Sequence, residues 1–167
     1  MRVKKLPVVL LLPEFISGCY SYRIYPKLLR DFKAPAPTTT VYIENPELKR
    51  EYAILQNSGI YNITNDSTCA SRIRLHKIKQ RFACGNAVPA WLIFLGQLPM
   101  HLPDLNQYSF EEIKNGDTTT IDTRLSVVKR YWFWDIFSRK KNFNKEAGKA
   151  LAINYYNPQT NITKAGN

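Results

Sequence analysis

A two-residue turn signal between two runs of alternating residues constrains the fold more than any other feature of the sequence. The dipeptide Asn115-Gly116 favours the tight turn of a β-hairpin, because both residue types tolerate positive φ angles. Tyr108 and Phe110 alternate with polar residues before it, and the segment TTTIDTRLSVV after it keeps most of its apolar residues on one face. The sequence therefore predicts two antiparallel strands joined at this turn.

Short strands and two helices are predicted around this hairpin. The segment NPE at 45–47 begins a helix, with the asparagine as its cap and the proline in its first turn, and Gly59 ends it. Residues 144–155 form a second helix, and residues 60–64 and 71–82 have the composition of strands. The predicted fold class is α+β, a mostly antiparallel sheet with one early helix and a C-terminal helix.

The amino-terminal segment has the order of a secretory signal. Basic residues at positions 2, 4 and 5 precede the apolar run Leu6 to Leu12, and the small residues Ser17 and Gly18 stand just before Cys19. The apolar run is far shorter than the roughly 20 residues that a membrane-spanning helix needs. Residues 1–18 are therefore expected to be a signal peptide that is cleaved after Gly18.

The segment Ile16-Ser17-Gly18-Cys19 resembles the lipobox of bacterial lipoproteins, in the relaxed form similar to that of spirochaetes. The resemblance covers about the first twenty residues. It implies that the thiol of Cys19 receives a diacylglyceryl group, that a dedicated peptidase cuts before Cys19, and that the new amino terminus is acylated. Several fatty chains hold a protein stably at a membrane, whereas one chain holds it only marginally.

The resemblance also bears on the location. An Asp after the cysteine is the usual sign of inner-membrane retention in enterobacteria, so Tyr20 in that position favours the outer membrane. The alternative is that the leader stays on the chain as a buried strand or helix, with Cys19 acting as a small apolar residue. We expect a lipid-anchored protein of the cell envelope.

Composition divides the rest of the chain near residue 40. Residues 19–39 end in KAPAPTTT, which favours an extended chain, and we interpret them as the lipidated amino terminus and a tether. The tyrosines at positions 20, 22 and 25 either sit among lipid headgroups or pack on the domain. Residues 40–156 are long enough for a single domain with its own core, and residues 157–167 read as a flexible tail.

Three cysteines are awkward for an exported protein unless one of them carries lipid. With Cys19 acylated, Cys69 and Cys84 remain as an even pair. A disulfide between them closes a loop of 14 intervening residues and contributes roughly 3 kcal/mol in an oxidising compartment. The alternative is two buried thiols.

Positive charge is concentrated in the segment SRIRLHKIKQRF at 71–82. Removing residues 1–18 takes three of the 24 basic and one of the 13 acidic residues, which leaves a net charge of +9. Arg72, Arg74 and Lys77 are candidates for contact with an anionic surface such as a lipid or with nucleic acid phosphates. A solvated edge strand that resists aggregation explains the same residues and is the interpretation we favour.

Two apolar segments each have two interpretations. Val88 to Met100 is too short to span a bilayer and is either a buried core segment or an apolar contact surface. Trp132, Trp134 and Phe137 are crowded into six residues and could stack on bases or sugars. Aromatic clusters more often close a core, and we expect these three side chains to lie in the core.

Residues that could carry catalysis are sparse. His76 and His101 are the two histidines, they belong to different segments, and residues 101–104 are expected to form a loop. The sequence has no nucleophile elbow, no phosphate-binding glycine loop and no metal-ligand spacing, so no catalytic residue, metal or cofactor is predicted.

The leading hypothesis is therefore a non-enzymatic envelope lipoprotein that binds a protein partner or an anionic surface. The alternative is a cytoplasmic nucleic-acid-binding protein that uses residues 71–82. An exported enzyme is the third hypothesis, and it would be favoured if His76 and His101 converged on a carboxylate in one pocket.

Overall fold

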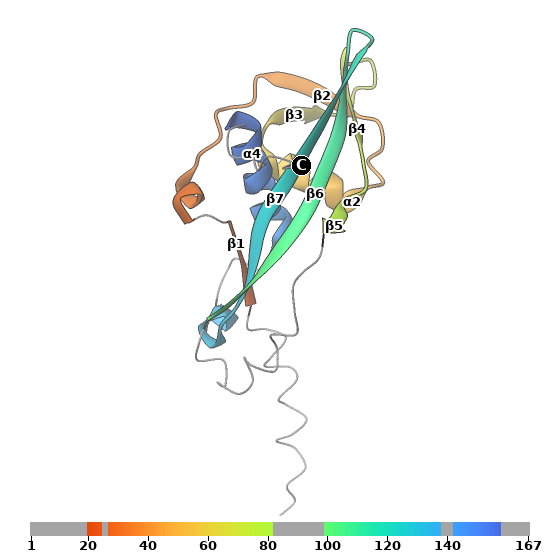
Figure 1. The fold of residues 1–167 in the computed structure, drawn as a ribbon. Helices are drawn as coiled ribbons and strands as arrows, with labels where there is room; N and C mark the ends of the chain where they lie inside the picture. Colours follow the sequence, from red (N-terminus) through yellow and green to blue (C-terminus); the bar gives the residue numbers. More distant parts are fainter. Residues whose placement is uncertain (1–19, 25–26, 82–98, 138–141, 158–167) are drawn as a thin grey trace, which may run out of the picture.

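The computed structural model describes residues 20–24, 27–81, 99–137 and 142–157 (Figure 1). In chain order the elements are β1 (Tyr20–Ile24), the 3-10 helix η1 (Lys27–Asp31), β2 (Thr39–Ile43), α2 (Lys49–Ser58), β3 (Tyr61–Thr64), β4 (Ser71–Leu75), β5 (Lys79–Arg81), β6 (Met100–Lys114), β7 (Asp117–Tyr131), the 3-10 helix η2 (Phe133–Phe137) and α4 (Phe143–Tyr156). The strands form one sheet in the order β1-β7-β6-β4-β2-β3, and β5 pairs with β6 beside that path. The predicted α+β class is confirmed.

The two longest strands, β6 and β7, form the predicted hairpin. Asn115 and Gly116 make its turn with φ angles of 53° and 88°. The strand before the turn starts earlier than predicted, at Met100, so that residues 101–104 pair with β7 instead of forming a loop. The sequence did not predict a strand at residues 101–104 because of Pro103, since proline is rare in strands that have partners on both sides. Among the described strands, only β7 pairs with β6 at that point.

The sheet is mixed and not mostly antiparallel. β2 runs parallel to both of its neighbours, with Thr39 opposite Tyr61 in β3 and Tyr42 opposite Arg72 in β4. The chain passes from β2 to β3 through α2, which is the kind of long crossover that parallel strands require. The prediction was wrong at this edge because alternation of apolar residues shows which side chains share a face and says nothing about strand direction.

The helix α2 begins later than the sequence predicts. Its amino-terminal cap is Leu48, which makes no capping hydrogen bond through its side chain. The side chain of Asn45 instead donates to the Leu75 carbonyl and accepts from the Leu75 amide, each at 2.8 Å. Asn45 therefore ties the end of β2 to the end of β4. Gly59 ends the helix with a φ angle of 65°, as predicted.

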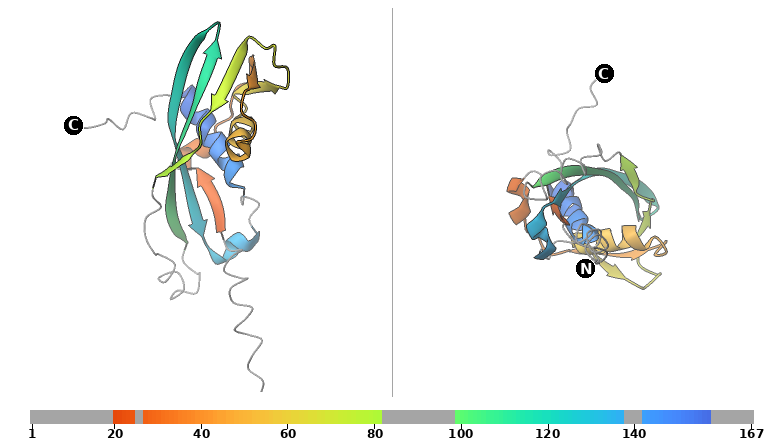
Figure 2. Two further views of the ribbon diagram at one scale, coloured as in Figure 1. Left: turned by 90° about the vertical axis from the view of Figure 1, so that its right-hand side faces the viewer. Right: turned by 90° about the horizontal axis from the view of Figure 1, so that it is seen from below.

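Both helices cover one face of the sheet, which curves around them (Figure 2). The carboxyl-terminal helix α4 starts close to its predicted position, after Asn142, whose side chain accepts a hydrogen bond from the Lys145 amide. Sheet and helices share one core, whose most buried apolar side chains are Val41, Ile54, Leu55, Ile73, Tyr108, Phe110, Leu125, Val127, Ala147 and Leu151.

The segment interpreted as a tether belongs largely to the fold. β1 pairs antiparallel with β7, with Tyr20 opposite Tyr131. The ring of Tyr22 packs edge-on against Phe143, with 5.4 Å between the ring centroids. Packing on the domain is therefore the correct interpretation for Tyr20 and Tyr22, and Tyr25 lies outside the described residues.

Packing also continues beyond β1. Phe32 and Ala34 are half-buried against the core, so the predicted tether of residues 19–39 is wrong for this part too. The Ala-Pro alternation misled the prediction, because a proline-rich segment is extended whether it crosses solvent or lies on a protein surface. The folded domain thus includes β1 at Tyr20–Ile24, well before residue 40.

The basic segment 71–82 forms two strands instead of one. Between β4 and β5 the Ile78 amide donates to the carboxylate of Glu51, a buried residue of α2, at 2.9 Å. β4 has strand partners on both sides, so it is not the edge strand that we favoured as an explanation of its charge.

Several predictions concern residues outside the described ranges. These are the signal peptide 1–18, the lipidation site Cys19, residues 88–98 of the apolar segment, and residues 158–167 of the tail.

Candidate functional site

The two basic residues of β4, Arg72 and Arg74, lie on the face of the sheet that points away from the helices, and Arg74 forms ion pairs there. Arg74 lies 3.0 Å from the carboxylate of Glu44 and 3.5 Å from that of Glu111. Glu111 also lies 3.1 Å from Nε2 of His76. Arg72 donates to the Ser67 carbonyl and remains exposed. The acidic neighbours thus offset the charge of Arg74, which makes residues 71–82 a weaker candidate for a phosphate-binding surface.

The two histidines do not share a site. The His76 amide donates to the Ser109 carbonyl of β6, whereas His101 is the second residue of that strand. Eight residues of strand separate Ser109 from His101, or about 27 Å at 3.4 Å per residue. The convergence on one carboxylate that would favour an exported enzyme is therefore not formed.

Cys69 carries a free thiol, whose Sγ lies 3.4 Å from the Thr40 carbonyl oxygen. Cys84 lies outside the described residues, so the Cys69–Cys84 disulfide is not seen and stays a prediction. Among the described residues, no group of three His, Cys, Asp or Glu side chains is placed to hold a metal ion. Likewise, none of the described helices is long and apolar enough to cross a membrane.

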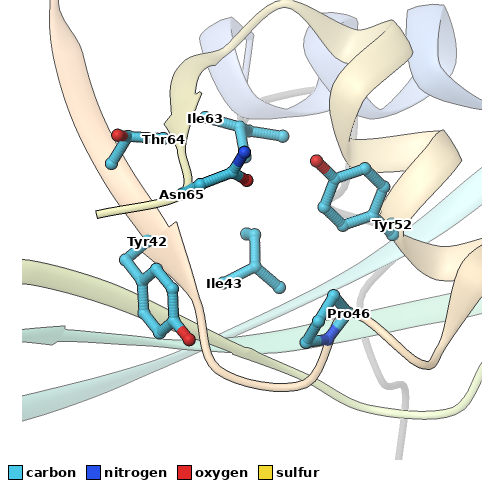
Figure 3. A pocket seen from close by; sticks show the side chains of 7 residues that line it. All are labelled: Tyr42, Ile43, Pro46, Tyr52, Ile63, Thr64 and Asn65. Atoms are coloured by element: carbon cyan, nitrogen blue, oxygen red, sulfur yellow. The ribbon is translucent and has the colours of Figure 1, made fainter. Parts of the chain in front are cut away.

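An open hollow of about 270 Å³ lies where β2 and β3 end beside α2 (Figure 3). Its lining residues are Tyr42, Ile43, Pro46, Tyr52, Ile63, Thr64 and Asn65. Figure 3 shows the rings of Tyr42 and Tyr52 on opposite sides of Ile43. The lining offers hydroxyl and amide groups but no carboxylate, imidazole or amine, so it suits a small neutral group better than an ion.

The end of the sheet next to Cys19 is built on a buried carboxylate. Asp135 in η2 is 2% exposed, and its Oδ2 accepts from the hydroxyl of Ser21 at 3.0 Å and from Nε of Arg130 at 2.9 Å. A second guanidinium nitrogen of Arg130 binds Oδ1, so this pair is bidentate. Arg23 adds an ion pair to the same carboxylate at 3.8 Å. These contacts fix η2 against β1 and β7.

A lysine on the other face of the same strands is held by aromatic rings. Nζ of Lys129 lies 4.4 Å from the ring centroid of Tyr20 and 4.8 Å from that of Tyr131. Burial disfavours the charged amine, but Tyr131, Tyr22 and Tyr20 outweigh that effect and raise the pKa of Lys129. The first residue of β1 is therefore packed on the sheet by its ring as well as by backbone pairing.

The prediction that the aromatic cluster Trp132, Trp134 and Phe137 lies in the core is wrong. Trp134 is 59% exposed and Phe137 is 77% exposed, whereas Trp132 is half-buried, with the Arg130 guanidinium 4.7 Å from the centroid of its ring. The tight turn of η2 puts Asp135 toward the sheet and Trp134 and Phe137 outward. η2 thus presents two large apolar side chains to the surface.

The sequence held one unused signal for this site. Asp135 stands inside the run YWFWDIF, where an acid among aromatic residues needs a partner if it is buried. Its partners Ser21 and Arg130 are distant in the sequence or separated by a turn, and no spacing rule joins them. Buried pairs of this kind are visible only in the folded chain.

No protein-family model matches the sequence, and no curated protein matches it. Five chains of solved structures match it, and the following two are among them. A minor lipoprotein from Acinetobacter baumannii is 13% identical, with 76% of this chain and 90% of that chain covered and a TM-score of 0.29. A dodecamer of a PelC variant from Paraburkholderia phytofirmans is 8% identical, with 80% and 95% covered and a TM-score of 0.32.

Proposed function

We propose that the chain is a non-enzymatic lipoprotein of the cell envelope, anchored through an acylated Cys19 in the outer membrane. The observation that carries this proposal is the lipobox-like segment Ile16–Cys19, which directly precedes β1 at Tyr20–Ile24. Cleavage before Cys19 would keep every described strand and helix on the mature chain. The residue that follows the lipobox-like segment already pairs with β7 in the sheet.

The anchored end of the molecule is also the end suited to touch the membrane. Tyr20 pairs with Tyr131, which directly precedes the turn that carries Trp134 and Phe137. Aromatic side chains are favoured at the boundary between water and lipid. An acyl chain on Cys19 would therefore bring these two exposed rings to the headgroup region.

The basic strand β4 has the opposite placement. Arg72 pairs with Ile113 near the hairpin turn, thirteen residues along β6 from Met100, which pairs with Tyr131. At about 3.4 Å per residue this is roughly 40 Å of strand. In a molecule that stands on its anchored end, the anionic surface is therefore met by η2, Arg72 and Arg74 lie toward the far end, and Lys77 lies beside the middle of β6.

Intact-mass measurement on protein recovered from detergent-solubilised bacterial envelopes tests the anchor. We expect the mass of residues 19–167 plus acyl chains, and Cys19→Ser should abolish both acylation and cleavage because the modified thiol is gone. Cys69→Ser is the matched control and should leave both unchanged. An unmodified full-length chain in the soluble fraction would contradict the proposal.

Quenching of tryptophan fluorescence by brominated lipids tests the contact. In the lipidated protein reconstituted into vesicles, we expect brominated acyl chains to quench Trp134, because its exposed ring lies beside the anchor. In a Trp91→Phe background, which removes the third tryptophan of the chain, Trp134→Phe should remove most of the quenchable emission, whereas Trp132→Phe should leave it in place. Equal quenching in these two variants would show that Trp134 is not the tryptophan nearest the lipid.

A further inference from the structure

A second hollow, of about 230 Å³, lies on the half of the sheet nearest Cys19. It is lined by the apolar residues Ile24, Pro103 and Val128 and by the polar residues Arg30 and His101. Four elements contribute, namely β1, η1, β6 and β7. The hollow is smaller than the 300–1,000 Å³ typical of pockets for drug-sized ligands, so it suits a compact group and not a whole lipid or sugar chain.

Positive charge dominates the surroundings of this hollow. Burial lowers the pKa of His101, and Arg130, Arg23 and Arg30 lower it further. The acid that opposes them is Asp135, whose carboxylate already accepts hydrogen bonds from Arg130 and Ser21. Three guanidinium groups therefore surround His101 against the carboxylate of Asp135, and with Glu146 near Arg23 counted as well the balance still favours an anion.

Arg30 is the residue best placed to bind that anion. Its Nε donates to the Ile24 carbonyl at 3.3 Å, which fixes the side chain at the wall of the hollow. A guanidinium held through Nε still has its two terminal nitrogens as donors, the arrangement that recognises phosphate and carboxylate oxygens. The apolar walls opposite it would cover a short hydrocarbon stem.

We propose that this hollow binds a phosphate group carried on a short apolar stem, with Arg30 as the main ligand and His101 as a second donor. A phosphate has several strong acceptor oxygens and can therefore bind several cationic groups at once. It fits this site better than an anion with one acceptor atom. The same chemistry occurs in a soluble alkyl phosphate and in the headgroup of a phospholipid. The site is independent of whether Cys19 is acylated.

His101 provides a direct readout, because the chain has only two histidines. We would follow the imidazole C2 proton signals of the full chain in neutral detergent micelles by NMR as a function of pH. Hexyl phosphate should raise the pKa of His101, because a bound anion stabilises the imidazolium, and should leave His76 unchanged. Charged groups facing His101 in the free protein are Arg23 on β1, Arg30 on η1, Arg130 on β7 and Asp135 on η2.

Variants separate the site from general charge. Arg30→Gln should weaken binding of hexyl phosphate by about tenfold or more, since it removes hydrogen bonds between charged groups. Arg30→Lys keeps the charge and should retain part of the affinity, and Arg72→Gln, an exposed charge at the other end of the sheet, should have no effect. Micelles that contain phosphatidylglycerol test whether the phosphate comes from a lipid. A raised pKa of His101 in these micelles would identify a lipid headgroup as the ligand. A raised pKa with hexyl phosphate alone would identify a soluble ligand.

Three results would overturn the proposal. An equal response of both histidines would indicate unspecific charge binding. A response of His101 to hexanol as strong as that to hexyl phosphate would indicate an apolar hollow without anion recognition. Absence of a response to both hexyl phosphate and phosphatidylglycerol would show that the hollow is not a phosphate site.

Discussion

Replacing Asp135 with Asn is expected to lower the free energy of unfolding by about 3–5 kcal/mol, which is the usual cost of removing one partner of a buried ion pair. The amide has nearly the shape of the carboxylate, so the loss comes from the uncompensated charge of Arg130 and Arg23 and from the weaker bond to Ser21. For a domain of this size the midpoint of thermal unfolding should fall by roughly 10 °C. Denaturant titration and calorimetry measure the two quantities.

The control for this variant is Asp122→Asn, because Asp122 is an exposed carboxylate on β7 that accepts a hydrogen bond from Gln107 of β6. That change should alter the free energy of unfolding by less than about 0.5 kcal/mol. Similar effects of the two substitutions would mean that Asp135 is hydrated, and that η2 is not held to the sheet through it. If Asp135 holds η2 to the sheet, D135N should also make the position of Trp134 less well defined. Brominated lipids should then quench the fluorescence of Trp134 less.

Replacing Gly148 with Ala is expected to destabilise the protein by about 2 kcal/mol, although alanine is the better helix former by roughly 1 kcal/mol. The reason is the crossing of α4 over α2. A Cβ at position 148 would lie 2.7 Å from the carbonyl carbon and Cβ of Asn57 and from the Ile54 carbonyl oxygen. Two of these three atoms are backbone, so the helices must move apart and leave gaps in the core between them.

Lys149→Ala is the matched comparison for Gly148→Ala, since it also places alanine in α4 but at an exposed position. Its effect on the free energy of unfolding should stay within about 0.5 kcal/mol. Chemical denaturation of both variants decides the question. A G148A protein as stable as the wild type would show that the two helices do not approach as closely as Gly148 permits.

Local rules predicted the parts of this fold that depend on neighbouring residues. The turn at Asn115 and Gly116 and the helix end at Gly59 were found because positive φ angles favour these residue types wherever they occur. The start of α4 was close for a related reason, since Asn142 caps it through a bond to the nearby Lys145 amide. Each of these features is decided within a few residues of chain.

Features that depend on distant residues escaped the prediction. Asn45 has the signature of a helix cap, yet it binds Leu75, thirty positions away, because tying β2 to β4 satisfies two backbone groups at once. Trp134 and Phe137 were assigned to the core because aromatic residues usually lie there, whereas the bond network of Asp135 turns them outward. The candidate phosphate site likewise joins Arg30 and His101 from opposite halves of the chain.

The pairing of β1 with β7 has a consequence for the order of folding. Tyr20 must find Tyr131, 111 positions further along the chain, and contacts between such distant residues form slowly. β1 comes first in the chain, but it has no partner until the hairpin of β6 and β7 has formed. From then until β1 joins the sheet, the edge of β7 is open to pairing with other chains. On a chain held at Cys19, we expect the last step of folding to take place at the membrane surface, when the residues beside the anchor close the sheet.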